Sequence, residues 1–349
     1  MLNFLYNLAT DKYKGAPYCL IKFFLFLLSL FYGLIVKALI FFSSFKSYRL
    51  DCKVISVGNI TLGGTGKTTL VEFIARYLRQ EGKIIAILSR GYKRKNSKAP
   101  GDEPYMLARN LKDVPVIVDA DRFRAGKQAL REYMINTLIL DDGFQQWKLK
   151  KDLEIVAIDS GNPFGNGYLI PRGILREPIS SLARADIFVL TKTNFDADIN
   201  STKAILTKLN PQALIIESAH IPLGFYSIDN PGELLNVEAF RGKEVTLFAG
   251  IAAPDSFENL IISLGIKIGL FFRFPDHYNY CAKNLDKIIN HSKERKIDTI
   301  ITTEKDAARI SALGLNTGYG LQILALRIAL SITKDEEKFY HRLLKLYQP

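Results

Sequence analysis

The stretch VISVGNITLGGTGKTTLVEFIARYL, residues 54–78, decides the fold. It begins as an apolar strand pattern, passes through a glycine-rich loop and ends in a helix pattern with one apolar face. Such a loop between strand and helix is typical of phosphate-binding P-loops, because glycines let backbone N–H groups turn toward phosphate oxygens. Thr61 stands where the usual pattern has its first glycine. Three inner glycines remain, so we predict a working nucleotide site.

The residue types in this loop predict individual roles. Lys67 is expected to reach the β- and γ-phosphates, and Thr68 to hold Mg²⁺ through its hydroxyl. The N-terminus of the following helix adds partial positive charge behind the phosphates. The predicted nucleotide-binding residues are Thr61, Gly63, Gly64, Thr65, Gly66, Lys67, Thr68 and Thr69.

Two further segments indicate which kind of P-loop protein this is. TLILDDGFQQ, residues 137–146, is an apolar strand pattern ending in Asp141 and Asp142, either of which would bind Mg²⁺ directly or through water. VLTKTN, residues 189–194, has Asn194 where a guanine-reading motif needs a carboxylate. Leu62 stands where partitioning-type ATPases usually carry a second lysine. Both switch-protein interpretations are weakened, and a small-molecule kinase is favoured.

Short apolar runs alternate with helix patterns along the chain. Runs rich in Val, Ile and Leu are typical of strands buried on both faces of a parallel sheet. The predicted strands span residues 53–57, 84–88, 114–118, 137–140, 154–158, 186–190 and 213–217. This alternation predicts a doubly wound α/β fold with a parallel sheet.

The alternation breaks at residues 221–234, IPLGFYSIDNPGEL, which are rich in turn residues. It restarts with predicted strands at 245–251, 268–273 and 299–302, and predicted helices at 255–264 and 284–295. We therefore predict three parts. They are an N-terminal apolar, membrane-anchoring region at 1–46, a P-loop α/β domain at 47–220, and a smaller α/β domain at 221–349.

Apolar character is concentrated near the N-terminus, where residues 23–36 read FFLFLLSLFYGLIV without a charge. A helix of that length measures about 21 Å, short of the roughly 30 Å of a bilayer core. Extension to Phe42 reaches that length only if Lys37 snorkels or faces a polar group. Six phenylalanines between Phe23 and Phe42 favour a membrane anchor, spanning or interfacial, over a buried core helix.

The overall composition limits the partners. There are 47 Lys and Arg against 35 Asp and Glu, a formal charge of +12, which favours nucleic acid, a phosphorylated substrate or an acidic membrane surface. The three cysteines are widely scattered, so we expect a reducing compartment rather than a disulfide framework. The four histidines have no metal-binding spacing, which argues against a structural zinc site.

Motifs along nearly the whole chain resemble the tetraacyldisaccharide 4'-kinase family of lipid A biosynthesis. In order, they are VGNITLGGTGKTTL, LSRGYKRK, GDEPYMLA, DDGFQQWKLKKDLEIVAID, FGNGYLIPRGILREP, FAGIAAPDSF, FPDHY and TTEKDAAR. The sequence departs from many relatives at Phe144, Gln146 and Trp147, where they carry Leu, His and Tyr, and at Arg172, where Ala is common. The first departure puts any role for a histidine at that motif in doubt.

The resemblance implies ATP, Mg²⁺ and a glucosamine disaccharide with four acyl chains and a 1-phosphate, phosphorylated at its 4'-hydroxyl. It also implies two α/β domains joined by a short β-ribbon, with the active site in the cleft between them. On this basis Asp102 is assigned as the base and His277 as its partner. Glu103 is assigned with Asp142 to the metal.

Basic residues offer contacts to an acidic head group. The SRGYKRK and DRFR segments supply arginines suited to bidentate phosphate binding, and we assign Arg90 and Arg122 to the substrate. Lys305 and Asp306 either contact the nucleotide or brace the cleft.

Three functions are weighed against each other. The first is the lipid kinase, acting at the anionic surface of the inner (cytoplasmic) membrane, peripheral or anchored by one helix, with its catalytic domains on the cytoplasmic side. It requires neither nucleic acid nor an obligatory protein partner. The second is a membrane-tethered NTPase switch that binds a protein. The third, a nucleic-acid-binding ATPase, rests only on charge and leaves the apolar N-terminus unexplained.

Overall fold

The structure, a computed structural model, describes residues 2–90, 101–194, 198–311 and 321–348. Arg90 of the SRGYKRK motif is described, whereas residues 91–95 of that motif lie outside the described residues. The chain divides into two compact units. The first comprises Met1–Gly91, Leu111–His220 and Leu330–Pro349, and the second comprises Tyr92–Asn110 and Ile221–Ala329.

These units differ in two segments from the contiguous domains that the sequence predicts. Helix α4 (Asp102–Asn110) belongs to the second unit, because ion pairs join it to helix α9 (Glu304–Ser311). Helix α10 (Glu336–Leu344) belongs to the first unit, because its aromatic side chains pack on helix α3 (Lys67–Gln80). Tertiary contacts, rather than position in the sequence, thus determine the unit to which each of these two helices belongs.

The first unit is built on a parallel sheet, which confirms the predicted fold class. Its strand pairs β1–β4, β1–β5, β2–β3, β2–β4, β5–β6 and β6–β7 are all parallel. Every residue of β2 and β4 is buried, as expected for strands covered on both faces. The strands lie in the order β3 (Val116–Val118), β2 (Ile85–Ser89), β4 (Thr137–Asp141), β1 (Lys53–Gly58), β5 (Leu153–Asp159), β6 (Ile187–Thr191) and β7 (Leu214–Ser227).

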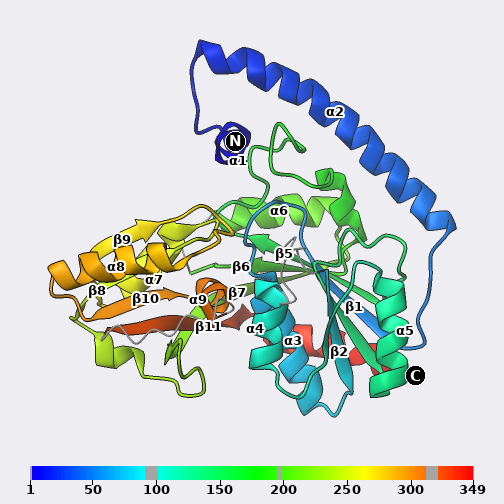
Figure 1. Cartoon of the computed structure of the whole chain (residues 1–349). Coiled ribbons are helices and arrows are strands. Elements are labelled where there is room, and N and C mark those ends of the chain that lie inside the picture. The colour runs from blue at the N-terminus through cyan, green and yellow to red at the C-terminus, as the bar shows by residue number, and fades with distance from the viewer. Residues whose placement is uncertain (1, 91–100, 195–197, 312–320, 349) are drawn as a thin grey trace. The chain divides into compact units, whose positions relative to one another are not determined.

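Helices pack against this sheet through small and branched apolar residues. Ala125 and Ala129 of α5 join one core cluster with Leu88 and Leu140 of the strands. A second cluster centres on Phe188 and includes Leu206 of α6. The helices of the first unit are α1 (Leu2–Ala9), α2 (Ala16–Phe45), α3, α5 (Arg122–Tyr133), α6 (Ile199–Leu209) and α10 (Figure 1).

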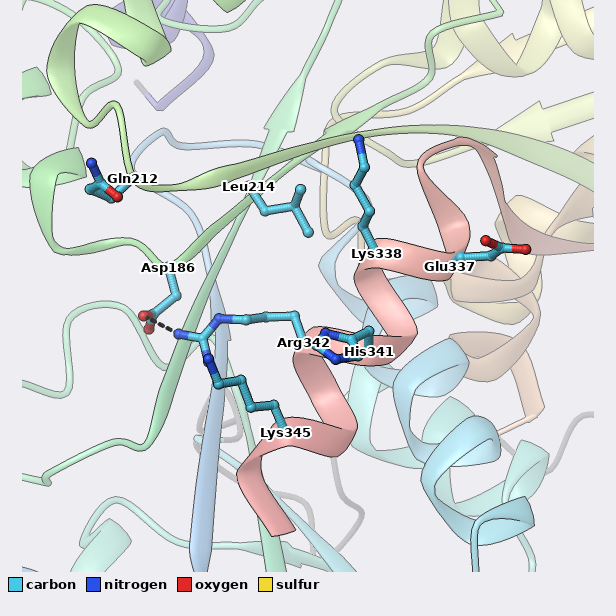
Figure 2. A pocket seen from close by; sticks show the side chains of 8 residues that line it. All are labelled: Asp186, Gln212, Leu214, Glu337, Lys338, His341, Arg342 and Lys345. Carbon is cyan, nitrogen blue, oxygen red and sulfur yellow. Dashed lines mark hydrogen bonds and ion pairs between the residues drawn. The ribbon is translucent and has the colours of Figure 1, made fainter. Parts of the chain in front are cut away.

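The C-terminal helix is fastened firmly to the first unit. The Tyr340 ring stacks on Tyr77 of α3 with centroids 4.1 Å apart, and Phe339 is fully buried. Arg342 Nη2 donates to Asp186 Oδ1 at 2.8 Å, in a pocket lined by Leu214 and by polar side chains (Figure 2). The last helix of the chain therefore completes the unit that contains the P-loop.

The second unit has its own parallel strands. They lie in the order β11 (Gln322–Lys334), β10 (Thr299–Thr303), β8 (Glu244–Ala249) and β9 (Lys267–Arg273). Helices α7 (Pro254–Ser263) and α8 (Ala282–Glu294) accompany them together with α4 and α9. Phe248 and Ile300 belong to one core cluster, and Leu247 and Ile301 to another. Successive residues of β8 and β10 thus alternate between two cores.

Helix α2 has one protected face along its length. Its buried residues are Leu25, Ser29, Gly33, Val36 and Ser43, a helical spacing. Within that face Tyr32 Oη donates to the backbone oxygen of Arg176 at 2.9 Å. The other faces expose large apolar side chains, and the helix is long and apolar enough to cross a membrane.

Candidate active site

The P-loop lies where the sequence predicts it, between β1 and α3. Helix α3 begins at Lys67 directly after Gly66, whose φ of 78° is in the left-handed region that favours glycine. A side chain at Gly66 would also collide with His220, whose Nε2 lies 2.8 Å from the position of a Cβ. The glycine therefore serves both the turn and the packing beneath it.

Thr61 is accommodated because its position needs no glycine. Among the described residues, the non-glycine residues with positive φ do not include Thr61. The residue is buried, forms an antiparallel bridge with Leu175, and its backbone oxygen accepts a hydrogen bond from Asn59 Nδ2 at 2.8 Å. Thr61 thus starts the loop as part of a short, hydrogen-bonded β-bridge.

Charged groups converge on the lysine of the loop. Lys67 Nζ donates to Asn59 Oδ1 at 3.1 Å and lies 3.4 Å from Asp142 Oδ1. Arg176 Nη1 donates to both oxygens of Asp142, at 2.8 and 3.0 Å. Burial raises the pKa of Asp142, but the charges of Lys67 and Arg176 outweigh that effect and lower it. Two cations and an ionised carboxylate suit the binding of a polyphosphate.

The oxygen groups near the loop have the chemistry of a magnesium site. Asp141 is buried at the end of β4, where its Oδ2 accepts a hydrogen bond from Ser89 Oγ at 3.1 Å. Asp142 follows it, and Thr68 is the second residue of α3. No group of three or more His, Cys, Asp or Glu that could hold a metal occurs among the described residues. Mg²⁺ takes one or two carboxylates and otherwise phosphate and water oxygens, so Asp141, Asp142 and Thr68 are donor types that fit it.

Arg122 is a buried cation with unused donors. Its Nη1 donates to the backbone oxygen of Asp119, whereas its Nε and Nη2 are buried with no hydrogen-bond partner among the described residues. Burial lowers the pKa of Arg122 to about 10. The negative charge of Asp141 opposes this shift by raising the pKa, and the positive charge of Arg90 adds to it. A buried guanidinium with free donors favours an anionic ligand.

The TKTN segment braces the P-loop. Thr191 Oγ1 donates to the Thr65 backbone oxygen at 3.0 Å, and Lys192 Nζ donates to the Gly64 backbone oxygen at 3.0 Å. Lys192 also pairs with Asp159 at the end of β5. The position of a guanine reader is thus occupied by residues that hold the loop.

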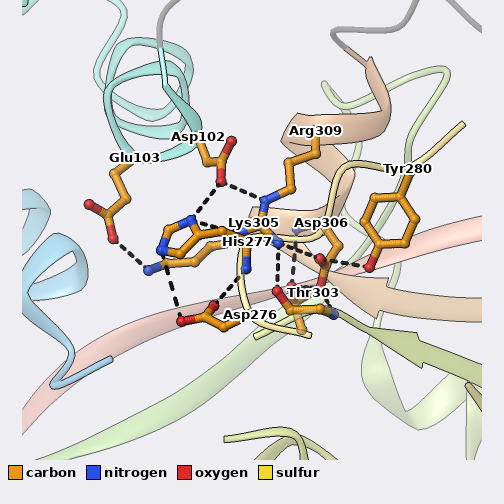
Figure 3. A network of polar contacts seen from close by, with 10 residues as sticks. Asp102, Glu103, Asp276, His277, Tyr280, Thr303, Lys305, Asp306 and Arg309 are labelled. Carbon is orange, nitrogen blue, oxygen red and sulfur yellow. Dashed lines mark hydrogen bonds and ion pairs between the residues drawn. The ribbon is translucent and has the colours of Figure 1, made fainter. Parts of the chain in front are cut away.

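The second unit brings Asp102 and His277 together (Figure 3). Asp102 begins α4, and its Oδ2 accepts a hydrogen bond from Arg309 Nε at 2.5 Å and lies 3.5 Å from His277 Nδ1. Burial raises the pKa of Asp102, but His277 and Arg309 outweigh it and bring the pKa to about 2. The Asp102 side chain is 12% exposed and that of His277 is 54% exposed, so the imidazole is the accessible half of the pair.

The predicted metal ligand Glu103 also lies in the second unit, whereas Thr68, Asp141 and Asp142 lie in the first. Glu103 Oε1 accepts a hydrogen bond from Lys305 Nζ at 2.6 Å. Asp306 is buried and accepts hydrogen bonds from Tyr280 Oη at 2.9 Å and from the Gly250 N–H at 3.1 Å. The TTEKDAAR segment thus braces this cluster.

Sequence reasoning missed several residues of the site. Asn59, Arg176 and Arg309 contact Lys67, Asp142 and Asp102, respectively. All three missed residues lie inside the motifs that carry the family resemblance. Membership of those motifs was the signal in the sequence that could have identified them.

The substituted DDGFQQW motif is also satisfied. Trp147 Nε1 and Gln145 Nε2 donate to the buried Glu177 at 3.1 and 3.0 Å. Phe144 packs so closely on β1 that a Cβ at Gly58 would lie 2.5 Å from it. The indole N–H of the half-buried tryptophan therefore has a hydrogen-bond partner.

A P-loop that leaves a parallel sheet, with paired carboxylates at the neighbouring strand end, defines the class of P-loop nucleotide-dependent proteins. Residues 21–348 match the family model described as tetraacyldisaccharide-1-P 4'-kinase. The chain belongs to that family.

Individual relatives agree. A tetraacyldisaccharide 4'-kinase from Syntrophus aciditrophicus (strain SB) is 37% identical over 330 residues, 86% of each chain. One from Halothermothrix orenii is 33% identical and covers 95% of each chain. The crystal structure of LpxK from Aquifex aeolicus in complex with ATP is 28% identical, with a TM-score of 0.73, and the match covers 94% of this chain and all of that one.

These matches confirm the predicted family and the predicted enzyme class. The chain is a kinase of lipid A biosynthesis. The alternative of a membrane-tethered NTPase switch is set aside by the same matches.

Proposed function

We propose that this kinase binds Mg·ATP at the Lys67 loop and transfers the γ-phosphate to the 4'-hydroxyl of a tetraacyldisaccharide 1-phosphate. The observation that carries the proposal is the convergence of Lys67, Arg176 and Asp142 at the P-loop. The resemblance to the ATP complex of LpxK supports ATP as the phosphate donor.

The first unit would bind the nucleotide. Lys67 and the N–H groups of residues 63–68 would bind the phosphates. Arg176, which now contacts Asp142, would move to the transferred phosphoryl group as negative charge develops on it. Thr68, Asp141, Asp142 and Glu103 would hold Mg²⁺, which neutralises phosphate charge when bound.

The second unit would supply the base. Asp102 would accept the proton of the 4'-hydroxyl, and His277, whose Nδ1 lies 3.5 Å from Asp102 Oδ2, would be its partner. The low pKa of Asp102 keeps it ionised over the physiological range, although it also makes the carboxylate a weak base. The exposed His277 imidazole is therefore the alternative acceptor of this proton. The kinetic test below distinguishes Asp102 from His277 as the base.

Two arginines would recognise the anionic head group. Arg122 offers buried donors without partners among the described residues, and Arg90 is exposed at the end of β2. Their mutual repulsion falls when an anion binds both. We assign the 1-phosphate to this pair.

The substrate's acyl chains call for a lipid surface, and α2 supplies one. Its protected face contacts the rest of the first unit through Phe26, which packs on Tyr168, and through Tyr32, which donates to the backbone oxygen of Arg176. A helix held against its own soluble unit in its middle cannot cross the bilayer without drawing that unit into hydrocarbon. We therefore place α2 in the plane of the cytoplasmic membrane surface, with its exposed apolar side chains in the lipid.

The test uses the full chain in detergent with Mg·ATP and tetraacyldisaccharide 1-phosphate, with bisphosphorylated lipid read by mass spectrometry. Lys67→Ala and Asp102→Asn should lower the rate by about 100-fold or more. The exposed residues Lys150 and Asp113 provide matched controls, because Lys150→Ala and Asp113→Asn should keep wild-type rates.

Each outcome decides a different part. Wild-type protein that hydrolyses ATP but yields no phosphorylated lipid would overturn the proposal. Full activity in Asp102→Asn with loss in His277→Gln would move the base to the imidazole. Activity that survives chelation of divalent metals would contradict the proposed requirement for Mg²⁺.

A further inference from the structure

One buried side chain, Arg309, contacts both members of the proposed base pair (Figure 3). Its side chain is 1% exposed. Its Nε donates to Asp102 Oδ2 at 2.5 Å, and its Nη2 lies 3.3 Å from His277 Nδ1. Because a guanidinium is planar and its donors are fixed in direction, one arginine that contacts both groups fixes their mutual geometry.

We propose that Arg309 is a positioning residue of the phosphotransfer reaction, which holds the Asp102 carboxylate against the His277 imidazole. This inference rests on the proposed roles of Asp102 and His277. It adds a residue that acts through them rather than on the substrate.

Arg309 is itself held in place on its other side. Its Nη1 donates to the Gly250 backbone oxygen at 2.6 Å and to Asp306 Oδ1 at 2.8 Å. Asp306 is in turn bonded by Tyr280, Thr303 and the Gly250 N–H. The donors of the guanidinium are thus divided between an anchor and the base pair, so small displacements of the base pair are opposed.

Asp102 is held by side chains from two other segments of the second unit. His277 comes from the segment after β9, and Arg309 comes from α9. Glu103, the next residue of α4, is bonded to Lys305, and Asp276 Oδ2 lies 3.9 Å from His277 Nε2. Removing Arg309 would take away a side chain that contacts both the Asp102 carboxylate and the His277 imidazole.

The same two helices provide a matched control. Arg109 of α4 pairs with Glu304 of α9 at 2.5 Å and donates to Tyr226 Oη at 2.6 Å. This ion pair also joins α4 to α9 through a largely buried arginine. The hydrogen bonds of Arg109 to described residues go to Glu304, Tyr226 and Asn110 rather than to Asp102 or His277. A purely structural Arg309 would behave like Arg109.

The experiment measures kcat and KM for the lipid, with Tm, for wild type, Arg309→Gln, Arg309→Lys and Arg109→Gln. Arg309→Gln should lower kcat by about tenfold or more and leave KM for the lipid within about twofold, because the base is misplaced while the residues that bind the lipid are untouched. Arg109→Gln should lower Tm and leave kcat within about twofold of wild type.

Arg309→Lys keeps the charge but cannot bridge both side chains, so it should also lower kcat while KM for the lipid stays near the wild-type value. Wild-type kcat in a folded Arg309→Lys or Arg309→Gln would overturn the inference. Asp102→Asn is measured in parallel. If it is as active as wild type, the proposed base fails and the inference with it. If it is inactive while both Arg309 variants match wild type, the inference alone fails.

Discussion

The exposed face of α2 allows a quantitative test of membrane docking. Phe31 and Leu34 are 63% and 66% exposed. For side chains of this size, that leaves about 240 Å² of surface in total, or about 6 kcal/mol at full burial. If about half of that area enters the lipid, the double variant Phe31→Asn/Leu34→Asn should lose about 3 kcal/mol, or about 100-fold in vesicle partitioning.

The assay is co-sedimentation with vesicles of phosphatidylethanolamine and phosphatidylglycerol. The control is Ile262→Asn/Met134→Asn, which alters two exposed apolar residues outside α2, 55% and 76% exposed. Circular dichroism checks that both variants are folded. A loss of less than about threefold, or a loss equal to that of the control, would refute docking through this face.

Two further perturbations test individual contacts. Asn59→Ala should lower kcat/KM for ATP by about tenfold, because Lys67 loses the buried amide 3.1 Å away, and unchanged steady-state kinetics would contradict this. Asp11 accepts hydrogen bonds from Lys22 and Arg172; burial opposes its ionisation, but these partners lower its pKa from 3.8 to about 2. Its contribution to stability is therefore complete above pH 3.8 and lost as the pH falls through about 2. Wild type should lose an increment of Tm over that interval that Asp11→Asn lacks, and parallel Tm curves would speak against the reasoning.

The P-loop and its sheet could be predicted because their signals are local. Strand β1, the glycine loop and α3 follow one another without interruption, and Asp141 ends β4 within a single apolar run. The parallel arrangement then brings these ends to one edge of the sheet. Periodicity and loop composition are sufficient to predict features whose residues lie close together in the sequence.

Longer-range features could not be predicted in this way. Arg309 meets Asp102 across 207 residues, and no periodicity encodes that contact. The run QILALRIALSITK forms β11, which the sequence analysis did not predict, and it carries the chain back into the first unit. Such features depend on which elements pack together in the folded chain. A single sequence indicates them only where its motifs resemble those of a known family.

The return of β11 and α10 to the first unit has a consequence for synthesis. The unit that holds the P-loop contains the first helices of the chain and also the last. A ribosome releases residues in order, so residues 221–311, together with α4, emerge before the nucleotide unit can close. Until Phe339 and Tyr340 reach α3, the P-loop helix lacks its aromatic cover. Loss of the C-terminal helix would therefore damage the nucleotide unit, encoded mostly far upstream, more than the unit beside it in sequence.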